Sequence, residues 1–316
     1  MTSDNLVLEN AQRILGQIRQ VVVGKDSVLL WVLAAILAKG HILLEDVPGV
    51  GKTTMALSFS KTLGLSHNRI QFTPDVLPSD VTGYTVMDPS TGAMHYRSGA
   101  VLCNLLLADE LNRATSRTQS ALLEAMEEGQ VTVDGTTHPL PRPFTVIATQ
   151  NPTGAAGTQL LPDSQMDRFT VRLTMGYPDP KDEMTMLMDR RQGDPLAQLK
   201  PLLDRDTLIA MQEMVSATYI KDSVLRYIVN LVCATRNHPD ILRGASPRAT
   251  LAMAAMSKSI ARIQGRDFVT PTDVQTVFIH TIAHRLLMAP GADARNVTAD
   301  SVLKTILGTV RAPSLN

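Results

Sequence analysis

The stretch His41-Ile-Leu-Leu-Glu-Asp-Val-Pro-Gly-Val-Gly-Lys-Thr-Thr54 decides the fold of this 316-residue chain. Its first four residues are apolar enough for a buried strand, and the segment from Pro48 to Gly51 breaks that pattern. Helical spacing of apolar residues then runs from Thr53 to Leu63. A strand, a glycine-rich turn and a helix in this order are the setting that a phosphate-binding loop requires.

The residues of the loop fit this interpretation at all but one position. The strict pattern has glycine where this chain has Asp46, while Gly49, Gly51, Lys52 and Thr53 match it. The glycines let backbone N–H groups converge on an anion at a positive helix end. Lys52 would reach the β- and γ-phosphates as a point charge, and Thr53 would place its hydroxyl on Mg²⁺.

Length and composition indicate a globular protein of the reducing cytosol. The chain is long enough for two domains, and 44% hydrophobic with 19% charged residues is typical of folded proteins. Thirty basic and 30 acidic residues give zero formal charge, which argues against general affinity for nucleic acid or anionic membranes. The longest apolar run, residues 28–38, is too short for a membrane span, and the first residues are not typical of a secretory signal. Two unclustered cysteines fit a cytoplasmic location.

A further apolar segment, Leu105 to Ala108, is followed directly by Asp109 and Glu110. At the carboxyl end of a parallel strand, Asp109 would lie beside the Mg²⁺ that Thr53 holds. Glu110 would then be free to orient and polarise the attacking water. Alone, two acids at a strand end are a weak signal, but together with the phosphate loop they predict a hydrolytic site.

Another apolar segment, Phe144 to Ala148, ends in Thr149-Gln150-Asn151. Thr149 and Asn151 would flank the γ-phosphate, where Asn151 could hold the water opposite Glu110. Asn-Pro is also common in turns, and taken alone this segment favours the turn.

Two arginines are candidates for completing the site. Arg168, in Asp167-Arg168-Phe169, could form a structural ion pair with Asp167 or reach the nucleotide of a neighbouring subunit. Arg248 opens a helix after Ser246 and could reach the nucleotide when a lid folds over it. A surface salt bridge is the simpler explanation for either arginine alone.

Strand-like and helical patterns alternate through the first half of the chain, which favours a parallel sheet with helices on both faces. We expect helices at residues 5–20 and 28–38, and strands at 41–44, 69–72, 105–108 and 144–148. Two prolines and a glycine between 176 and 180 predict a hinge. Beyond it the pattern is helical, at residues 206–219, 222–236, 246–264 and 271–287. Thr270 is a good N-cap for the last of these helices.

The order of these parts resembles that of the AAA+ ATPases: a Walker A loop, a Walker B Asp-Glu pair, a sensor asparagine, an arginine finger, and a helical lid with a sensor arginine. Three longer blocks look like signatures of the MoxR family. They are QFTPDVLPSDVTGY (residues 71–84), LLLADELNRATSRTQSALLEAMEEGQVTV (105–133) and ATQNP…GTQLLPDSQMDRF (148–169). The similarity runs from about residue 21 to the helix that follows Arg248.

This resemblance implies an α/β fold, in which a P-loop AAA+ core has a parallel sheet flanked by helices and is followed by a C-terminal all-helical lid domain. The core would comprise residues 1–178 and the lid residues 179–316. An insertion in the second helix of the core would lie at about 78–98, and a hairpin before the sensor strand at about 129–143.

The resemblance also implies roles for individual residues. The catalytic residues would be Glu110, Asn151, Arg168 and Arg248. The nucleotide would be bound by Val22, Val23, Gly24, Pro48, Gly49, Val50, Gly51, Lys52, Thr53, Thr54 and Asp109, with Thr53 and Asp109 holding Mg²⁺. Arg113 and Arg117, one turn apart after the Walker B pair, are alternatives to Arg168 as the inter-subunit finger.

Proteins of this family hydrolyse ATP with Mg²⁺, assemble as ring hexamers, and remodel client protein complexes, often with a von Willebrand factor A-domain partner. We expect the same here, without nucleic acid or membrane insertion. A nucleic-acid motor shares this core, but the segment 129–143 has only Asp134, His138 and Arg142, with no cluster of Lys or Arg to follow phosphates. A scaffold that binds ATP without turnover is the third possibility, and the intact Glu110 argues against it.

Overall fold

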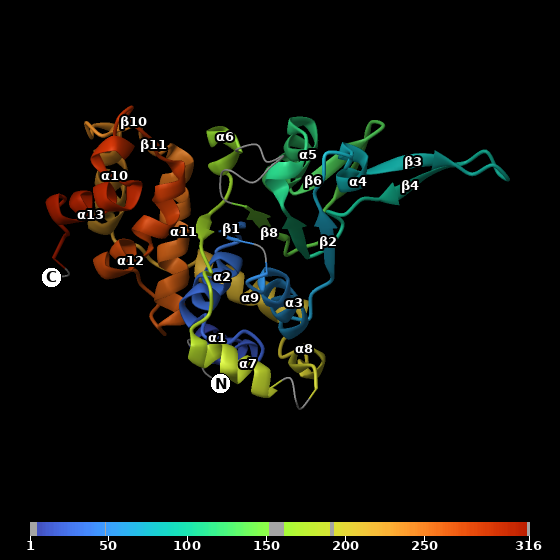
Figure 1. Cartoon of the computed structure of the whole chain (residues 1–316), viewed down its shortest axis with the longest axis horizontal. Helices are drawn as coiled ribbons and strands as arrows, with labels where there is room; N and C mark the ends of the chain where they lie inside the picture. Colours follow the sequence, from blue (N-terminus) through green and yellow to red (C-terminus); the bar gives the residue numbers. More distant parts are fainter. Residues whose placement is uncertain (1–4, 48, 152–160, 190–192, 315–316) are drawn as a thin grey trace.

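The structure is a computed structural model that describes residues 5–47, 49–151, 161–189 and 193–314. Its centre is a parallel sheet of five strands in the order β2-β5-β8-β1-β9 (Figure 1). The strands are β1 (Ile42–Glu45), β2 (His67–Gln71), β5 (Leu105–Asp109), β8 (Thr145–Gln150) and β9 (Val171–Leu173).

Both faces of this sheet are buried. Successive residues of its inner strands point to opposite sides, and on each side they enter a hydrophobic cluster. Leu105 and Leu107 belong to one hydrophobic cluster, whereas Leu106 and Ala108 belong to the other. Helices α1 (Leu6–Ile18), α2 (Asp26–Leu37) and α3 (Lys52–Thr62) contribute to the first cluster, and α5 (Ser116–Glu128) contributes to the second. The prediction of a parallel sheet flanked by helices is confirmed.

The register of the strands brings the site segments to one edge of the sheet. Glu45 of β1 lies opposite Gln150 of β8, and Ala108 of β5 lies opposite Ala148 of β8. The loop after β1, the acids that end and follow β5, and the residues after β8 therefore meet at the carboxyl ends of three neighbouring strands.

The first two predicted helices match α1 and α2, and four predicted strands match β1, β2, β5 and β8 within three residues. The fifth strand, β9, was missed. It has only three residues, Val-Arg-Leu, and pairs with β1 at the border of the sheet.

Two antiparallel hairpins extend from the sheet region (Figure 1). The first, β3 (Gly83–Met87) with β4 (Met94–Ser98), follows the short helix α4 (Pro78–Thr82), and the second is β6 (Gln130–Val133) with β7 (Thr136–Pro139). The ring of Tyr96 in β4 stacks on the ring of His138 in β7, with centroids 3.7 Å apart. The two hairpins are thereby joined to each other.

The C-terminal part is mainly helical. Its elements are α7 (Pro180–Asp189), α8 (Pro195–Gln198), α9 (Arg205–Ser216), α10 (Asp222–Arg236), α11 (Pro247–Ile263), α12 (Pro271–Ile282) and α13 (Ala299–Thr309), after the core helix α6 (Asp163–Met166). The Thr270 hydroxyl accepts from the N–H of Asp273 and the Asp273 carboxylate accepts from the N–H of Thr270, which confirms the predicted start of α12. Strands β10 (Ile241–Arg243) and β11 (Leu287–Met288) form a short antiparallel ladder. The expectation of an all-helical lid is corrected accordingly, and the last predicted helix ends at Ile282 rather than at residue 287.

One hydrophobic cluster crosses from the sheet region into the C-terminal part. Met211 of α9, Ile260 of α11 and Val277 of α12 share it with α1, α2 and the sheet. A separate cluster joins α10, α11, α12 and α13. The division of the chain at residue 178 stays a prediction.

Candidate functional site

The phosphate-binding loop has the backbone shape that its glycines allow. Gly49 and Gly51 have φ values of 88° and 92°, in the left-handed region that favours glycine. Helix α3 begins at Lys52, so Thr53 and Thr54 lie in its first turn. Pro48 lies outside the described residues.

Lys52 is turned into its own loop. Its Nζ donates to the carbonyl oxygen of Asp46 at 2.9 Å and to that of Val47 at 3.2 Å. Burial lowers the pKa of Lys52, against the opposing effect of the Asp46, Asp109 and Glu110 carboxylates. A phosphate group would offer this cation a charged partner in place of two carbonyl dipoles.

Asp109, at the end of β5, is held by two neighbouring strands. Its Oδ1 accepts from the Thr149 hydroxyl of β8 at 2.6 Å, and its Oδ2 accepts from Arg69 of β2 at 2.8 Å. The carboxylate is thereby oriented toward the edge of the sheet where the phosphate loop lies.

Glu110 adopts an unusual backbone, with φ at 54°. Its N–H donates to the Thr149 hydroxyl at 2.8 Å. Its carboxylate accepts from Asn151 Nδ2 at 3.2 Å and pairs with Arg113 at 2.8 Å. A non-glycine residue in this region is uncommon and is maintained by its surroundings, here by contacts on both its backbone and its side chain.

Asn151 therefore lies beside Glu110 and bonds to it directly, while the predicted role of Asn151 toward a water stays a prediction. The main chain of Asn151 is held by Asn112, which accepts from its N–H at 3.4 Å and donates to its carbonyl at 3.3 Å. Thr149 was expected to flank the γ-phosphate. Instead its side chain is buried, and its hydroxyl forms hydrogen bonds with Asp109 and Glu110.

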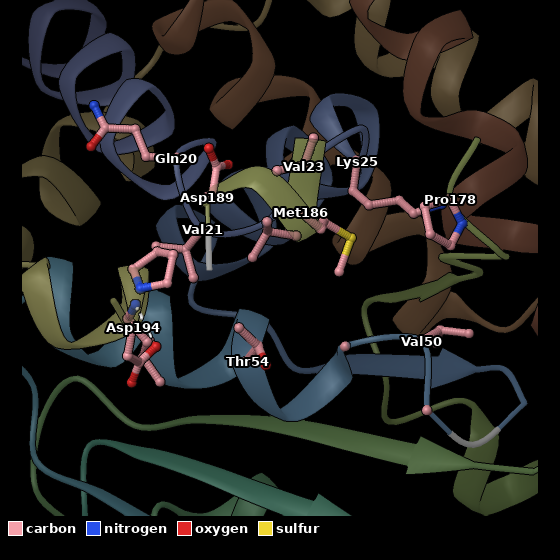
Figure 2. Close-up of a pocket in the computed structure, with 15 residues that line it drawn as sticks. Gln20, Val21, Val23, Lys25, Val50, Thr54, Pro178, Met186, Asp189 and Asp194 are labelled. Carbon is pink, nitrogen blue, oxygen red and sulfur yellow. Dashed lines mark hydrogen bonds between the residues drawn. The ribbon is translucent and has the colours of Figure 1, made fainter. Parts of the chain in front are cut away.

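A cavity of about 250 Å³ opens next to the loop (Figure 2). Six of the predicted nucleotide-binding residues line it: Val22, Val23, Gly49, Val50, Gly51 and Thr54. Its opposite wall comes from the segment after β9 and includes Pro178, Met186 and Asp189. Lys52, Thr53, Asp109 and Glu110 are not among its lining residues.

Gly24 lies just outside this cavity, with φ at 73°. The Asp182 carboxylate of α7 is so close that a Cβ atom on Gly24 would be 1.8 Å from Asp182 Oδ2. A side chain at this position would therefore have a strained backbone and would have to displace the Asp182 carboxylate.

The donor set at the sheet edge suits ATP with Mg²⁺. A Thr hydroxyl and an Asp carboxylate are oxygen ligands, which Mg²⁺ prefers, and this ion usually takes its remaining ligands from phosphates and water. Within the described ranges, no group of three or more His, Cys, Asp or Glu side chains could hold a metal ion.

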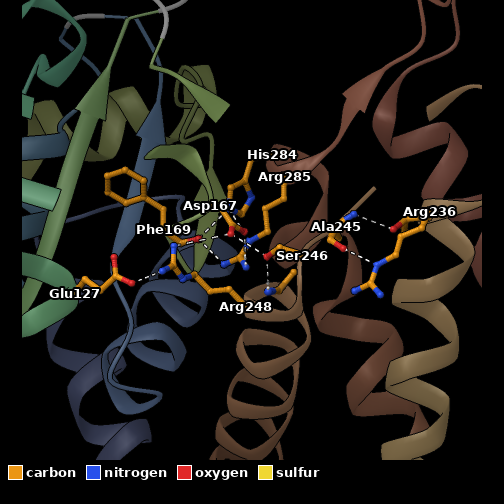
Figure 3. A network of polar contacts seen from close by, with 11 residues as sticks. Glu127, Asp167, Phe169, Arg236, Ala245, Ser246, Arg248, His284 and Arg285 are labelled. Carbon is orange, nitrogen blue, oxygen red and sulfur yellow. Dashed lines mark hydrogen bonds and ion pairs between the residues drawn. The ribbon is translucent and has the colours of Figure 1, made fainter. Parts of the chain in front are cut away.

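The two predicted arginines lie together, because both contact Glu127 at the end of α5. Figure 3 shows Arg248 beside Glu127, between the sheet region and the C-terminal helices. Arg168 Nη2 is 3.2 Å from Glu127 Oε2, and Arg248 pairs with Oε1 of the same carboxylate. Neither arginine lines the cavity. Arg168 does not form the pair with Asp167 that the sequence suggested.

Asp167 instead connects to the C-terminal helices. It accepts from the Ser246 hydroxyl at 2.8 Å and pairs with Arg285 at 3.2 Å. Arg285 is nearly inaccessible, and its burial lowers its pKa to about 10. Arg285 Nη2 also donates to the Phe169 carbonyl at 2.7 Å, and His284 Nε2 contacts the same oxygen.

Sequence reasoning missed Arg285, Arg69 and Asn112 as supports of the site. Each acts on a residue distant in the sequence. Arg285 and Arg69 lie outside the quoted motifs, and Asn112 lies within the block 105–133, whose resemblance alone does not indicate its contact with Asn151. Arg113 pairs with Glu110 of its own chain, whereas Arg117 is exposed on α5.

No helix in the part of the chain that the structure describes has the length and apolar character to cross a bilayer.

Two family models match the chain. Residues 41–171 match the ATPase family associated with various cellular activities (AAA), and residues 233–306 match the AAA lid domain.

Individual proteins and structures are similar along nearly the whole chain. The protein YeaC of Bacillus subtilis is 44% identical over 94% of this chain and 92% of its own length. The chaperone MoxR1 of Mycobacterium tuberculosis is 37% identical over 96% of this chain and 83% of its own. The crystal structure of a protein assigned as an ATPase in Cytophaga hutchinsonii has a TM-score of 0.91 at 34% identity, over 98% of this chain and 96% of that one.

Proposed function

This chain belongs to the MoxR family of AAA+ ATPases, and we propose that it uses Mg²⁺-dependent hydrolysis of ATP to remodel a client protein complex. The observation that carries the proposal is the meeting of Asp109, Glu110 and Asn151 at the sheet edge beside the phosphate loop. Binding alone would require the loop and Asp109, but it would not require Glu110 and Asn151 next to them.

Each residue at this edge has a distinct role in the proposed reaction. Lys52 leaves the carbonyl oxygens of its loop and neutralises the β- and γ-phosphates. Thr53 and Asp109 hold Mg²⁺, which neutralises charge on the phosphates when bound. Glu110 orients the attacking water, and Asn151 keeps the Glu110 carboxylate in place.

The base and ribose would occupy the cavity between the loop and the segment after β9. Val22, Val23 and Met186 line this cavity, and Val23 and Met186 can be followed in Figure 2. The apolar residues suit a planar base, and the polar lining residues Gln20, Lys25, Asp189 and Asp194 could bond to the base and ribose.

Arg168 and Arg248 are proposed to act on the nucleotide of a neighbouring subunit. Both arginines pair with Glu127 and neither lines the cavity of its own chain, which supports this role for both. The alternative, that Arg248 reaches the nucleotide of its own chain when the lid folds over it, stays a prediction. In a ring, phosphates of the neighbour would compete with Glu127 for the two guanidinium groups.

We propose a homohexameric ring that acts on a protein client together with a von Willebrand factor A-domain partner. Similarity to a relative named as a chaperone supports a protein client. Zero formal charge and the absence of a Lys or Arg cluster on the β6–β7 hairpin favour a protein over nucleic acid. Two free cysteines, one of them buried, are compatible with the cytoplasm.

A phosphate-release assay on the purified protein with ATP and Mg²⁺ tests the activity. Glu110→Gln should bind ATP and lose most turnover, by about 10²–10⁴-fold. Lys52→Ala should lose ATP binding itself, because the phosphates then lack their cation. Near-normal hydrolysis by Glu110→Gln protein would refute its role, and stimulation of turnover by DNA or RNA would favour a nucleic-acid motor.

A further inference from the structure

Asp46 occupies the loop position at which the strict phosphate-loop pattern has glycine. Its main chain continues the sheet, because its N–H donates to the Gln150 carbonyl of β8 at 3.2 Å. The side chain is buried, with 5% of the residue exposed. It is therefore an acid inside the loop that would bind phosphate, where a negative charge needs a specific reason.

The carboxylate of Asp46 binds the segment that leaves the sheet after β9. Its Oδ2 accepts from the N–H of Met175 at 2.5 Å and from the N–H of Gly176 at 2.8 Å. Its Oδ1 accepts from the N–H of Val47 at 3.1 Å. Three backbone donors satisfy this buried carboxylate.

The same residue contacts Lys52 through its main chain, since Lys52 Nζ donates to the Asp46 carbonyl. Asp46 is thus bonded at one end to the cation that would bind phosphate and at the other end to residues 175 and 176. Lys25, which lines the cavity, holds the next residue of that segment by donating to the Tyr177 carbonyl at 2.9 Å.

The segment 175–189 forms one wall of the cavity through Pro178, Met186 and Asp189, which line it together with the phosphate loop. Helix α7 in this wall buries none of its side chains. The wall therefore depends on a few polar attachments, and those at its base are made by Asp46 and Lys25.

We propose that Asp46 is a positioning residue that fastens this wall, residues 175–189, to the phosphate loop, so that the wall responds to ATP. When phosphate draws Lys52 Nζ away, the peptide group after Asp46 loses its cation, while the carboxylate stays bonded to residues 175 and 176. A movement of the Lys52 ammonium group is thereby transmitted to the wall through Asp46. This inference rests on the proposed function, because it requires that ATP binds at this loop.

Amide hydrogen exchange, with and without a non-hydrolysable ATP analogue and Mg²⁺, tests the proposal on the full chain. In the wild type, peptides covering 174–189 should exchange more slowly with the analogue. Asp46→Gly restores the strict loop pattern, so the first turn of α3 should still respond to the analogue. Its 174–189 peptides should exchange rapidly in both conditions, and turnover at saturating ATP should fall roughly tenfold or more.

Asp46→Asn is the matched control, because its side-chain oxygen can still accept from both N–H groups, and it should retain the response of the wall. Should Asp46→Gly fail to fold, Asp46→Ser replaces it, since one short hydroxyl cannot satisfy both donors. A wild-type response of 174–189 in Asp46→Gly or Asp46→Ser would overturn the role of Asp46 alone. If the wild-type α3 turn does not respond to the analogue, ATP binding itself fails, and the proposed function fails with it.

Discussion

Thr149 supplies one hydroxyl to both acids of the site. It donates to Asp109 and accepts from the N–H of Glu110. A single buried side chain thus fixes the carboxylate that would hold Mg²⁺ and the backbone from which the water-orienting glutamate projects.

Thr149→Val keeps the shape of this side chain and removes the hydroxyl. Because the N–H of Glu110 would then lack its acceptor and Asp109 one donor, turnover should fall roughly 10- to 100-fold. ATP affinity should change little, since the phosphate loop is intact. Steady-state hydrolysis and equilibrium binding measure the two effects, and Thr149→Ser should recover most of the activity. Full turnover by the valine variant would contradict the structural role.

His41, the residue before β1, makes two hydrogen bonds that require a neutral ring. Its Nδ1 accepts from the N–H of Val146 at 3.0 Å, and its Nε2 lies 3.2 Å from the Met126 carbonyl. Nδ1 is therefore unprotonated, and Nε2 carries the hydrogen. Burial lowers the pKa of His41 from 6.5 to about 4.

Acid should therefore destabilise the protein through His41. The unfolded chain takes up a proton near pH 6.5, while the folded ring resists it down to about pH 4. The stabilisation is present above pH 6.5 and is lost as the pH falls toward 4, by about 2 kcal/mol between pH 7 and pH 5. Urea unfolding at both pH values measures it. Between pH 7 and pH 5, the His41→Gln variant should lose less of its free energy of unfolding than the wild type, by that amount. This variant retains His284 and the other titrating groups.

The sequence predicted correctly which residues lie close together at the site. It predicted less well which hydrogen bonds and ion pairs they form. Asp109, Glu110 and Asn151 come together because parallel strands end at one edge. The direction of Thr149 and the pairing of Arg168 with Glu127 depend on rotamers and on contacts between distant segments, which spacing does not encode.

At the scale of elements, helix α7 packs closely against the segment before α2, where the Asp182 carboxylate lies against Gly24. Asp182 of α7 lies where any side chain on residue 24 would have to be. This contact adds to the attachments of the cavity wall.

Gly24→Ala should weaken ATP binding by roughly tenfold, because a left-handed backbone costs a non-glycine residue about 1–2 kcal/mol and the new Cβ displaces Asp182. In Gly24→Ala with Asp182→Ala the collision is removed and only the backbone strain remains. Titration with a fluorescent ATP analogue should place the double variant between the single Gly24→Ala variant and the wild type. Equal affinities for Gly24→Ala and the wild type would show that the fit does not matter for binding.

Long periodic elements were predictable, and short ones were not. Helices α1, α2, α10 and α12 each carry a regular apolar pattern or a clear start signal. Strands β9, β10 and β11 have two or three residues, too few for any period, and they exist because neighbouring elements offer backbone partners. Helix α13 was missed although its Thr298 forms a capping box.

At the scale of the whole molecule, the sheet region and the C-terminal helices share a continuous hydrophobic cluster. Buried links such as Arg285 to the Phe169 carbonyl add polar contacts across the same border. Large swinging of the C-terminal part about residues 176–180 would break this cluster, so small sliding movements are the motion that the packing permits.

Mixing two inactive variants tests whether the site is completed by a neighbour. Arg168→Ala protein has an intact ATP site, and Glu110→Gln protein has an intact arginine. An arginine finger is worth about 10³–10⁵ in rate, far more than the roughly 0–1 kcal/mol of an exposed ion pair. Mixed rings should therefore regain measurable activity.

Light scattering with ATP and Mg²⁺ is the control that both variants assemble, and subunit exchange between differently tagged variants should accompany it. If rings exchange subunits and no mixture exceeds the sum of its parts, Arg168 does not act in trans. Arg117 and Arg113 are then the residues to test.

The order of strands also bears on how this protein avoids unwanted self-association. With zero formal charge, long-range repulsion between molecules is weak, and unpaired strands at sheet borders are templates for aggregation. Here one border strand, β2, carries His67 and Arg69 on its exposed positions, and the other, β9, has three residues and lies against α12. Neither border of the five-stranded sheet offers a long apolar strand, so this sheet presents a poor template for pairing with the sheet of another copy.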